Sequence, residues 1–349
     1  MKDSGRTEGR DIMKKSIAAL ILSVIMALSA FSGCGNKGSD TIDSVILKIG
    51  VSTGETDPRN IAAKQFADEI SEKTDGRITA VVYPSGQLGG DAALIDALAV
   101  DSKKVDIVIT DASNFATYEP KMGISALPFL FEDFDTAWAF MDSDVEAEAE
   151  KLLIKNNMRV LAHYCNGFRC VTNSIKPIEK PEDMQRLVIR TPENPIIMAT
   201  MTALGANPQP LSFSELYPAL KQGTYDAQEN PIPVIYNNNL YEVQEYLSVT
   251  NHIYSGMCFT ISESVWNRLA PGDREIIRQA ALDSAVADRE NNRSQTEELL
   301  GALREAGMKI NEPDLEPFAL ATESVMKENA AIYGDLYEKM EAWRNTHRR

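Results

Sequence analysis

Strand-like and helix-like segments alternate along residues 45–110, and this alternation constrains the fold more than any other feature of the chain. Residues 45–51, 78–83 and 105–110 are apolar and rich in β-branched side chains, as strands are. Between the first two, Asp57-Pro58 is typical of a helix start and Gly76 of a helix stop. Residues 91–100 are predicted to form a second helix. The β-α-β-α-β order predicts an α/β fold with a doubly wound, mostly parallel sheet.

A second α/β pattern begins near residue 159. Ser212 and Glu215 have the spacing of a capping box, which predicts a helix that ends at Gly223. Two successive α/β units predict two lobes. The further predicted elements are strands at 159–164, 187–190, 225–229 and 246–250, and a helix at 196–204.

The last third of the chain is predicted to be helical, from 264 to about 303 with a break at Pro271-Gly272, and again from 313 to 349. The segment 274–304 is too charged to be buried by one sheet, which predicts a brace that crosses both lobes. We expect lobe I to comprise residues 45–166 and 256–295, and lobe II to comprise residues 167–255 and 296–349.

The first 33 residues have the pattern of a signal peptide. Lys14 and Lys15 precede an apolar run at 17–30, which is short for a membrane span and long enough for a signal core. The run ends in Phe31-Ser32-Gly33-Cys34, which resembles a lipoprotein cleavage site, although Phe31 stands where leucine is usual. We therefore expect a lipid on Cys34, a polar tether at 34–44, a start at Met13 and an extracytoplasmic body. An uncleaved anchor helix is the alternative.

The net charge limits the kinds of binding partner, and the cysteine count limits the possible disulfides. The formal net charge of the 349 residues is −16, which argues against nucleic acid or anionic lipid as a surface partner. A few buried arginines can still create a local site for an anion. Beyond Cys34 the chain has three cysteines, which cannot all pair. Cys165 and Cys170 either form a disulfide or are buried thiols.

Arg190 is the main candidate binding residue. It ends the apolar run 187–189, and a guanidinium at the end of a strand presents a planar fork that matches a carboxylate. Ligands of open α/β sheets bind outside the carboxyl ends of strands, where Asn230 and Asn114 are also expected. The alternatives are structural: Arg190 could pair with a buried glutamate, and Asn230 before Pro231 could be a turn residue.

An ordered set of motifs resembles one family, the extracytoplasmic solute-binding proteins of TRAP transporters, which capture organic acids for a membrane importer. The resemblance covers nearly all of residues 45–292. Its elements are Phe66-Ala67-Asp68-Glu69-Ile70, Thr74-Asp75-Gly76-Arg77, Tyr83-Pro84-Ser85-Gly86-Gln87-Leu88-Gly89, Leu127-Pro128-Phe129-Leu130-Phe131, Gly167-Phe168-Arg169, Asn173-Ser174, Lys176-Pro177-Ile178, Ile189-Arg190, Leu204-Gly205-Ala206-Asn207-Pro208, Phe213-Ser214-Glu215-Leu216-Tyr217-Pro218-Ala219-Leu220, Gln228-Glu229-Asn230-Pro231 and Asn251-His252-Ile253-Tyr254.

The resemblance implies a two-lobed clamshell with a long helix bracing both lobes. It implies a salt bridge from Arg190 to the ligand carboxylate, further contacts from Arg169 and Asn230, and an aromatic wall at Phe213. Arg169 with a structural role and Phe213 in the core are the alternatives. The sequence departs from the family where Asp57-Pro58 replaces a frequent His-Pro and where Tyr225-Asp226-Ala227 replaces a more usual Val-Asp-Gly. Asp57 is near the expected cleft, and we expect it to bond a hydroxyl or a distal polar end of the ligand.

The expected function is a monomeric receptor that binds a sugar acid, such as a uronate or aldonate, and delivers it to TRAP membrane subunits. A C4 dicarboxylate, an amino acid or a 2-oxo acid is the alternative ligand. A sensor subunit for a membrane kinase and a secreted hydrolase are the alternatives from other classes. No cofactor is predicted, and no two of the three histidines have metal-ligand spacing. His163 and Cys165 share a strand face but lack a third, orienting residue, so no catalytic site is predicted.

Overall fold

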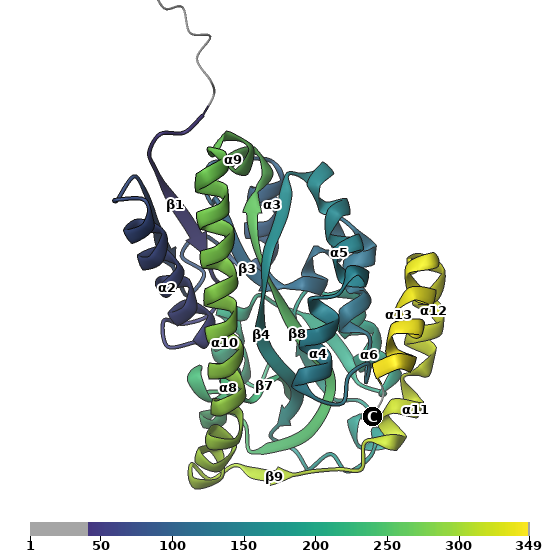
Figure 1. The fold of residues 1–349 in the computed structure, drawn as a ribbon. Coiled ribbons are helices and arrows are strands. Elements are labelled where there is room, and N and C mark those ends of the chain that lie inside the picture. The colour runs from purple at the N-terminus through teal and green to yellow at the C-terminus, as the bar shows by residue number, and fades with distance from the viewer. Residues whose placement is uncertain (1–40, 348–349) are drawn as a thin grey trace, which may run out of the picture. The chain divides into compact units, whose positions relative to one another are not determined.

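The computed structural model describes residues 41–347, which apart from residues 41 and 42 lie in one compact unit, Asp43–Arg349. The predicted signal peptide, Cys34 and most of the predicted tether lie outside the described residues. The described unit is an α/β fold built on one mixed sheet (Figure 1). Among residues 41–347, no helix combines the length and the apolar character needed to cross a membrane.

The sheet contains nine strands in the described residues, in the order β2-β1-β3-β8-β4-β7-β5-β6, with β9 paired to β8. The strands are β1 (Val45–Gly50), β2 (Ile78–Tyr83), β3 (Ile107–Asp111), β4 (Met158–Asn173), β5 (Val188–Thr191), β6 (Asn207–Pro210), β7 (Ala227–Pro231), β8 (Tyr246–Ser262) and β9 (Lys309–Asn311). The strands at the two ends of the sheet pair in parallel, as predicted for the β1–β3 end; at the other end β5 pairs with β6, a strand that the sequence did not predict.

The middle of the sheet differs from the prediction. β4 and β8 are antiparallel to each other, β3 is antiparallel to β8, and β7 is antiparallel to β4, so the sheet is mixed rather than mostly parallel. Both middle strands are also much longer than the segments predicted at 159–164 and 246–250. Three register shifts interrupt their ladder, and Gly167 stands at one of them with a φ of 108°. A bulge breaks the period-two pattern from which a strand is recognised.

Helices cover the β1–β3 end of the sheet. Asp57 caps α2 (Pro58–Lys73) as predicted, because its side chain accepts a hydrogen bond from the backbone N–H of Arg59. Phe66 and Ile70 of α2 are fully buried against the strands. On the same half lie α3 (Asp91–Ala99), α4 (Phe134–Met141) and α5 (Asp144–Lys151).

The β5–β7 end carries α6 (Pro195–Ala203), α7 (Leu216–Lys221) and α8 (Ile232–Asn237). The predicted capping box is wrong: the hydroxyl of Ser212 pairs with that of Ser214 at 3.2 Å and does not cap a helix. Phe213–Glu215 form a 3-10 turn before α7, so the helix begins one turn later than predicted. The other 3-10 turns are Ala112–Thr117, Pro120–Ala126, Leu152–Asn156, Pro181–Met184 and Leu240–Glu242.

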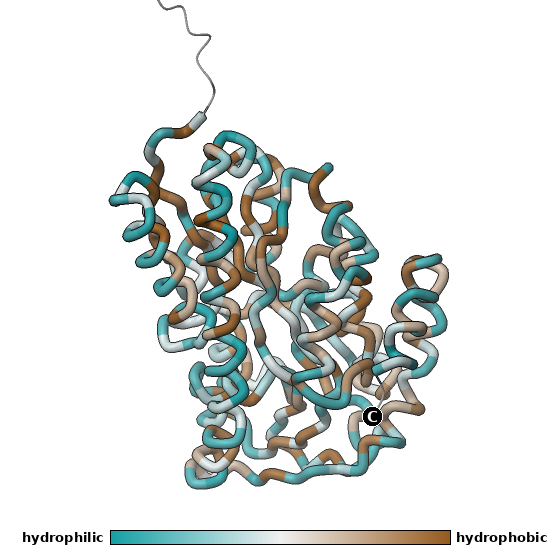
Figure 2. The backbone as a smooth tube through the Cα atoms, viewed as in Figure 1, coloured by the Kyte–Doolittle hydropathy of each residue, from teal (hydrophilic) through white to brown (hydrophobic). Residues whose placement is uncertain are grey.

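A long helix braces both halves, as predicted. After α9 (Glu263–Arg268), α10 (Pro271–Glu305) runs for 35 residues along the sheet (Figure 1). Ile277 near its start is buried in the core that contains β1 and α2, while Leu303 near its end is buried in the core beneath α7 and α8. Hydrophilic and hydrophobic residues alternate along α10 (Figure 2), as expected of a helix with one face in solvent.

The chain ends in α11 (Glu316–Ala321), α12 (Glu323–Tyr333) and α13 (Asp335–His347). Leu336 and Met340 of α13 are fully buried in the same core cluster as Leu94 of α3 and Phe140 of α4. The C-terminal helix therefore packs on the β1–β3 half. The division of residues between lobe I and lobe II stays a prediction.

Candidate functional site: a polar cavity with three buried arginines

A small polar cavity lies where strands from both halves of the sheet end. Its volume is about 40 Å³, and it adjoins a groove of about 770 Å³ with which it shares several residues. Five of the six ligand-binding residues predicted from the sequence line the cavity, together with one arginine that the sequence did not single out. These residues are Asn114, Arg169, Arg190, Phe213 and Asn230, joined by Arg59.

Arg190 carries a buried charge that no carboxylate neutralises. The residue is only 2 % exposed, and it forms no ion pair with any carboxylate of residues 41–347. Its Nε and Nη2 atoms both donate to the carbonyl oxygen of Leu211, with Nε at 2.9 Å, and its guanidinium lies 5.8 Å from the centre of the Phe213 ring. Burial lowers the pKa of Arg190 to about 10. The site therefore favours an incoming anion.

Arg169 is buried as well, but its charge is already paired. Its guanidinium forks onto the carboxylate of Glu229, with Nη2 at 2.9 Å from Oε1 and a second bond from Nε to Oε2. Burial alone would lower the pKa of Arg169, yet the neighbouring Glu229 raises it above its ordinary value. His252 extends the network, with Nε2 at 3.3 Å from Glu229. The Arg169 side chain is therefore held in place at the cavity wall, and Glu229 neutralises its charge.

The two predicted asparagines are held by hydrogen bonds from neighbouring elements. Asn230 on β7 accepts from Nη2 of Arg169 at 3.2 Å and donates to Gln228 at 2.6 Å. Asn114 donates to the hydroxyl of Thr110 at 2.9 Å and accepts from Asn194, the N-cap of α6, at 3.2 Å. Asn230 lies within a strand and not in a turn. Both amides therefore present fixed dipoles to the cavity.

Asp57 is the predicted site residue that does not line the cavity. Its Oδ1 atom accepts from Nε of Arg59 at 2.8 Å, and it lies behind that arginine. Arg59 lines the cavity and donates from Nη2 to Asn166. Asp57 was proposed because it departs from the family's usual residue near the cleft, and no pattern in the sequence singled out Arg59, two positions later, as the residue that lines the cavity.

Two carboxylates at the cavity were also missed. Asp91, the first residue of α3, accepts from the hydroxyl of Ser52 at 3.1 Å, and burial raises the pKa of its carboxyl group. Asp111, the last residue of β3, accepts from the N–H of Ser113 at 2.9 Å and from the hydroxyl of Ser255. Both lie in the cavity wall, where they can accept hydrogen bonds from ligand hydroxyls.

His163 and Cys165 do not form the kind of pair that activates a nucleophile. The ring of His163 contacts Asp142 and Glu150, and burial raises the pKa of the Cys165 thiol to about 12, which disfavours the reactive thiolate. Cys165 and Cys170 are both buried free thiols and do not form the disulfide that the sequence left open.

Comparisons with known proteins agree with this architecture. The family model described as "Bacterial extracellular solute-binding protein, family 7" matches residues 49–331. The 2,3-diketo-L-gulonate-binding periplasmic protein of Escherichia coli is 32 % identical over 286 residues, which is 82 % of this chain and 85 % of that protein. The sialic acid-binding periplasmic protein of Vibrio cholerae is 32 % identical over 320 residues, 91 % of this chain and 95 % of the other.

Among solved structures, a TRAP periplasmic solute-binding protein from Polaromonas, bound to D-erythronate, superimposes with a TM-score of 0.84 at 32 % identity. The match covers 88 % of this chain and all of the other. Sequence, fold and a buried polar cavity between two halves of one sheet lead to the same assignment. The chain belongs to the bacterial extracellular solute-binding proteins of family 7.

Proposed function

We propose that the protein is the extracytoplasmic receptor of a TRAP-type transporter and that it binds a sugar acid through Arg190. The observation that carries this proposal is the buried guanidinium of Arg190, which has no carboxylate partner among residues 41–347. A buried cation is costly unless an anion compensates it. The ligand carboxylate would supply the missing charge in a bidentate pair.

The remaining cavity residues favour a hydroxylated monocarboxylate. Arg169 and Asn230 would hold the carboxylate end together with Arg190. At the other side, Asp91 and Asp111 can accept hydrogen bonds from hydroxyl groups, whereas a second carboxylate there would meet like charge. The E. coli relative is named for a diketogulonate and the Polaromonas structure holds D-erythronate, both sugar-derived acids, which supports the proposal.

Transport would use binding without turnover. The ligand bridges residues of both halves of the sheet and thereby favours a closed form by its differential affinity. The closed, loaded form would then dock on the membrane subunits. We further propose that lipid on Cys34 holds the monomeric body at the outer face of the cytoplasmic membrane, with residues 34–44 as the tether.

The proposal is tested by ligand binding to the full chain. A panel of aldonates, uronates and C4 dicarboxylates is screened by thermal shift, and hits are measured by calorimetry. A ligand at about 100 times its Kd stabilises the native state by about 2.7 kcal/mol, which raises the Tm measurably. We expect sugar acids to give the largest shift, and a larger shift from C4 dicarboxylates would overturn the ligand class.

The role of Arg190 is tested in the same assay with Arg190→Met. We expect affinity for the best acid to fall at least about 100-fold, because a buried partner of the carboxylate is lost. Arg278→Met removes an exposed arginine of α10 and should leave affinity unchanged. If Arg190→Met retains affinity within a few-fold, the arginine clamp is wrong.

A further inference from the structure

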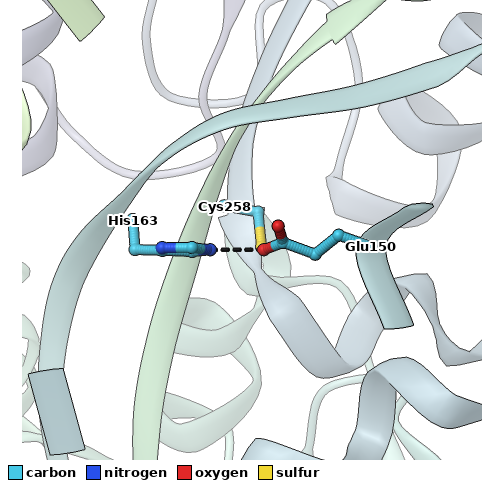
Figure 3. Close-up of side chains that lie close together, drawn as sticks. All are labelled: Glu150, His163 and Cys258. Carbon is cyan, nitrogen blue, oxygen red and sulfur yellow. Dashed lines mark hydrogen bonds and ion pairs between the residues drawn. The ribbon is translucent and has the colours of Figure 1, made fainter. Parts of the chain in front are cut away.

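A second cluster of ionisable side chains, Glu150, His163 and Cys258, lies outside the polar cavity (Figure 3). His163 on β4 and Cys258 on β8 are directly paired across the two strands, so their side chains share one face of the sheet. Glu150 reaches this face from α5. One oxygen of Glu150, one ring nitrogen of His163 and the sulfur of Cys258 all lie within 4.8 Å of one another.

The histidine is oriented by a carboxylate on its far side. Nδ1 of His163 lies 3.2 Å from Oδ1 of Asp142, and Nε2 points to Glu150. Arg289 fixes Asp142 with two bonds, at 2.6 and 2.8 Å, and donates from Nε to the carbonyl oxygen of His163 at 2.9 Å. A carboxylate that holds one ring nitrogen while the other faces a metal is the usual outer arrangement of histidine ligands.

The charges of the cluster also suit a divalent cation. One Glu150 carboxylate, one Cys258 thiolate and a neutral imidazole would balance a 2+ ion. Beside them, Glu146 is fully buried; Ser125 donates to its Oε1 at 3.1 Å, and its Oε2 has no hydrogen-bond partner among residues 41–347. Burial raises the pKa of the Glu146 carboxyl group, and the neighbouring Glu150 carboxylate raises it further.

We propose that Glu150, His163 and Cys258 form a binding site for a divalent transition metal, with Zn²⁺ as the best match. The mixture of one oxygen, one nitrogen and one sulfur suits Zn²⁺ and Co²⁺, whereas Mg²⁺ and Ca²⁺ require oxygen ligands. Binding to the protonated cluster releases two protons to solvent, one from Nε2 of His163 and one from the thiol of Cys258. Affinity therefore increases as the pH rises.

A metal bound at this site would link α5 to β4 and β8. The side chains of the site are close enough to the surface for a metal to enter, since those of His163 and Glu150 are 11 % and 14 % exposed. Sequence spacing could not reveal the site: Glu150 and His163 are 13 residues apart, but Cys258 on β8 is distant along the chain and joins them only through the pairing of β4 with β8. The proposal is independent of the identity of the organic acid.

The test is a titration of the metal-free full chain with Co²⁺, followed by displacement with Zn²⁺. We expect one Co²⁺ per chain at micromolar metal, with the absorption band that marks a bond between a thiolate and cobalt. Cys258→Ala should abolish this band, and Glu150→Gln should weaken binding at least about tenfold. Cys170→Ala removes another buried thiol outside the cluster and serves as the matched control.

Asp142→Asn tests the orienting carboxylate, and we expect it to weaken Co²⁺ binding by about 10–100-fold while the thiolate band persists. Thermal unfolding of each variant without metal confirms that it is folded. Absence of a thiolate band in the folded wild-type chain, or its persistence in Cys258→Ala, would overturn the proposal. In that case His163 and Glu150 form an ion pair only.

Discussion

The three buried arginines at the cavity differ in what neutralises each charge. Arg59 pairs with Asp57 at 2.8 Å and Arg169 pairs with Glu229, whereas within residues 41–347 Arg190 contacts the carbonyl of Leu211 and the ring of Phe213 and no carboxylate. Loss of an arginine that is already paired leaves a buried carboxylate without compensation. Loss of Arg190 removes two hydrogen bonds to the carbonyl of Leu211 but leaves no buried carboxylate without compensation. The same substitution should therefore have different effects at Arg169 and Arg190.

We predict that Arg169→Met lowers the free energy of unfolding by about 3–5 kcal/mol, because the buried carboxylate of Glu229 loses its ion-pair partner. Arg190→Met should leave that free energy unchanged or raise it. Denaturant unfolding of the ligand-free full chain measures both. Equal destabilisation by the two variants would contradict the distinction between a structural and a ligand-binding arginine.

Patterns in the sequence predicted which residues line the cavity, but not which of its arginines carries an unneutralised charge. Arg190, Asn230 and Asn114 were predicted because the ends of strands meet at one edge of a sheet, and all three line the cavity. Which arginine Glu229 neutralises could not be predicted, because Glu229 and Arg169 are 60 residues apart and become neighbours only through the pairing of β4 with β7. Tertiary pairing, and not local pattern, decides which charge remains free.

At the scale of elements, β1, β2, β3 and α2 followed from local pattern, whereas the terminal strand β6 and the full lengths of β4 and β8 did not. The register shifts between β4 and β8 disturb the alternation of buried and exposed residues, and most of both strands is covered on both faces. Such strands give no periodic signal. The antiparallel middle of the sheet likewise depends on contacts between distant segments, which no local motif encodes.

The brace α10 is joined to β4 by a carboxyl group with a strongly shifted pKa. Asp288 is almost fully buried and accepts from the backbone N–H of Cys165 at 2.6 Å, while its Oδ1 has no hydrogen-bond partner among residues 41–347. Burial raises the pKa of Asp288 to about 8. Between its ordinary value and about 8, the native state holds a proton that the unfolded chain has lost. Stability attributable to this group therefore falls as the pH rises through that window.

We predict that Asp288→Asn makes the protein more stable than the wild type at pH 8 and flattens the decline in Tm from pH 5 to pH 8. The amide keeps the acceptor for Cys165 and cannot ionise. Asp283→Asn, at an exposed position of the same helix, should leave the slope unchanged. Parallel pH profiles for Asp288→Asn and the wild type would show that Asp288 is ionised in the native state at neutral pH.

At the scale of the whole molecule, the net charge opposes the ligand that Arg190 would attract. The chain carries a formal net charge of −16, and the groove beside the cavity is lined by acidic side chains, among them Asp96, Glu193 and Glu215. An organic acid must pass this field before it reaches the guanidinium. Salt screens repulsion between exposed charges over about 10 Å at 0.1 M ionic strength.

We predict that association of the acid becomes faster as salt concentration rises, while dissociation from the buried pair changes little. Stopped-flow fluorescence at low and moderate salt measures both rate constants. Glu193→Gln with Glu215→Gln should raise the association rate at low salt and reduce its dependence on salt. A rate that falls with salt would mean that the arginines, and not the acidic rim, dominate the approach.

The path of the chain through the sheet limits what genetic recombination between related receptors can produce. The chain builds the β1–β3 end, passes along β4 to the β5–β7 end, returns along β8, crosses again in α10, and finishes with α13 back on the first half. Neither half corresponds to one continuous stretch of the gene. A single crossover between two related genes would therefore mix both walls of the cavity, so new specificity should arise more readily by point substitution than by exchange of segments.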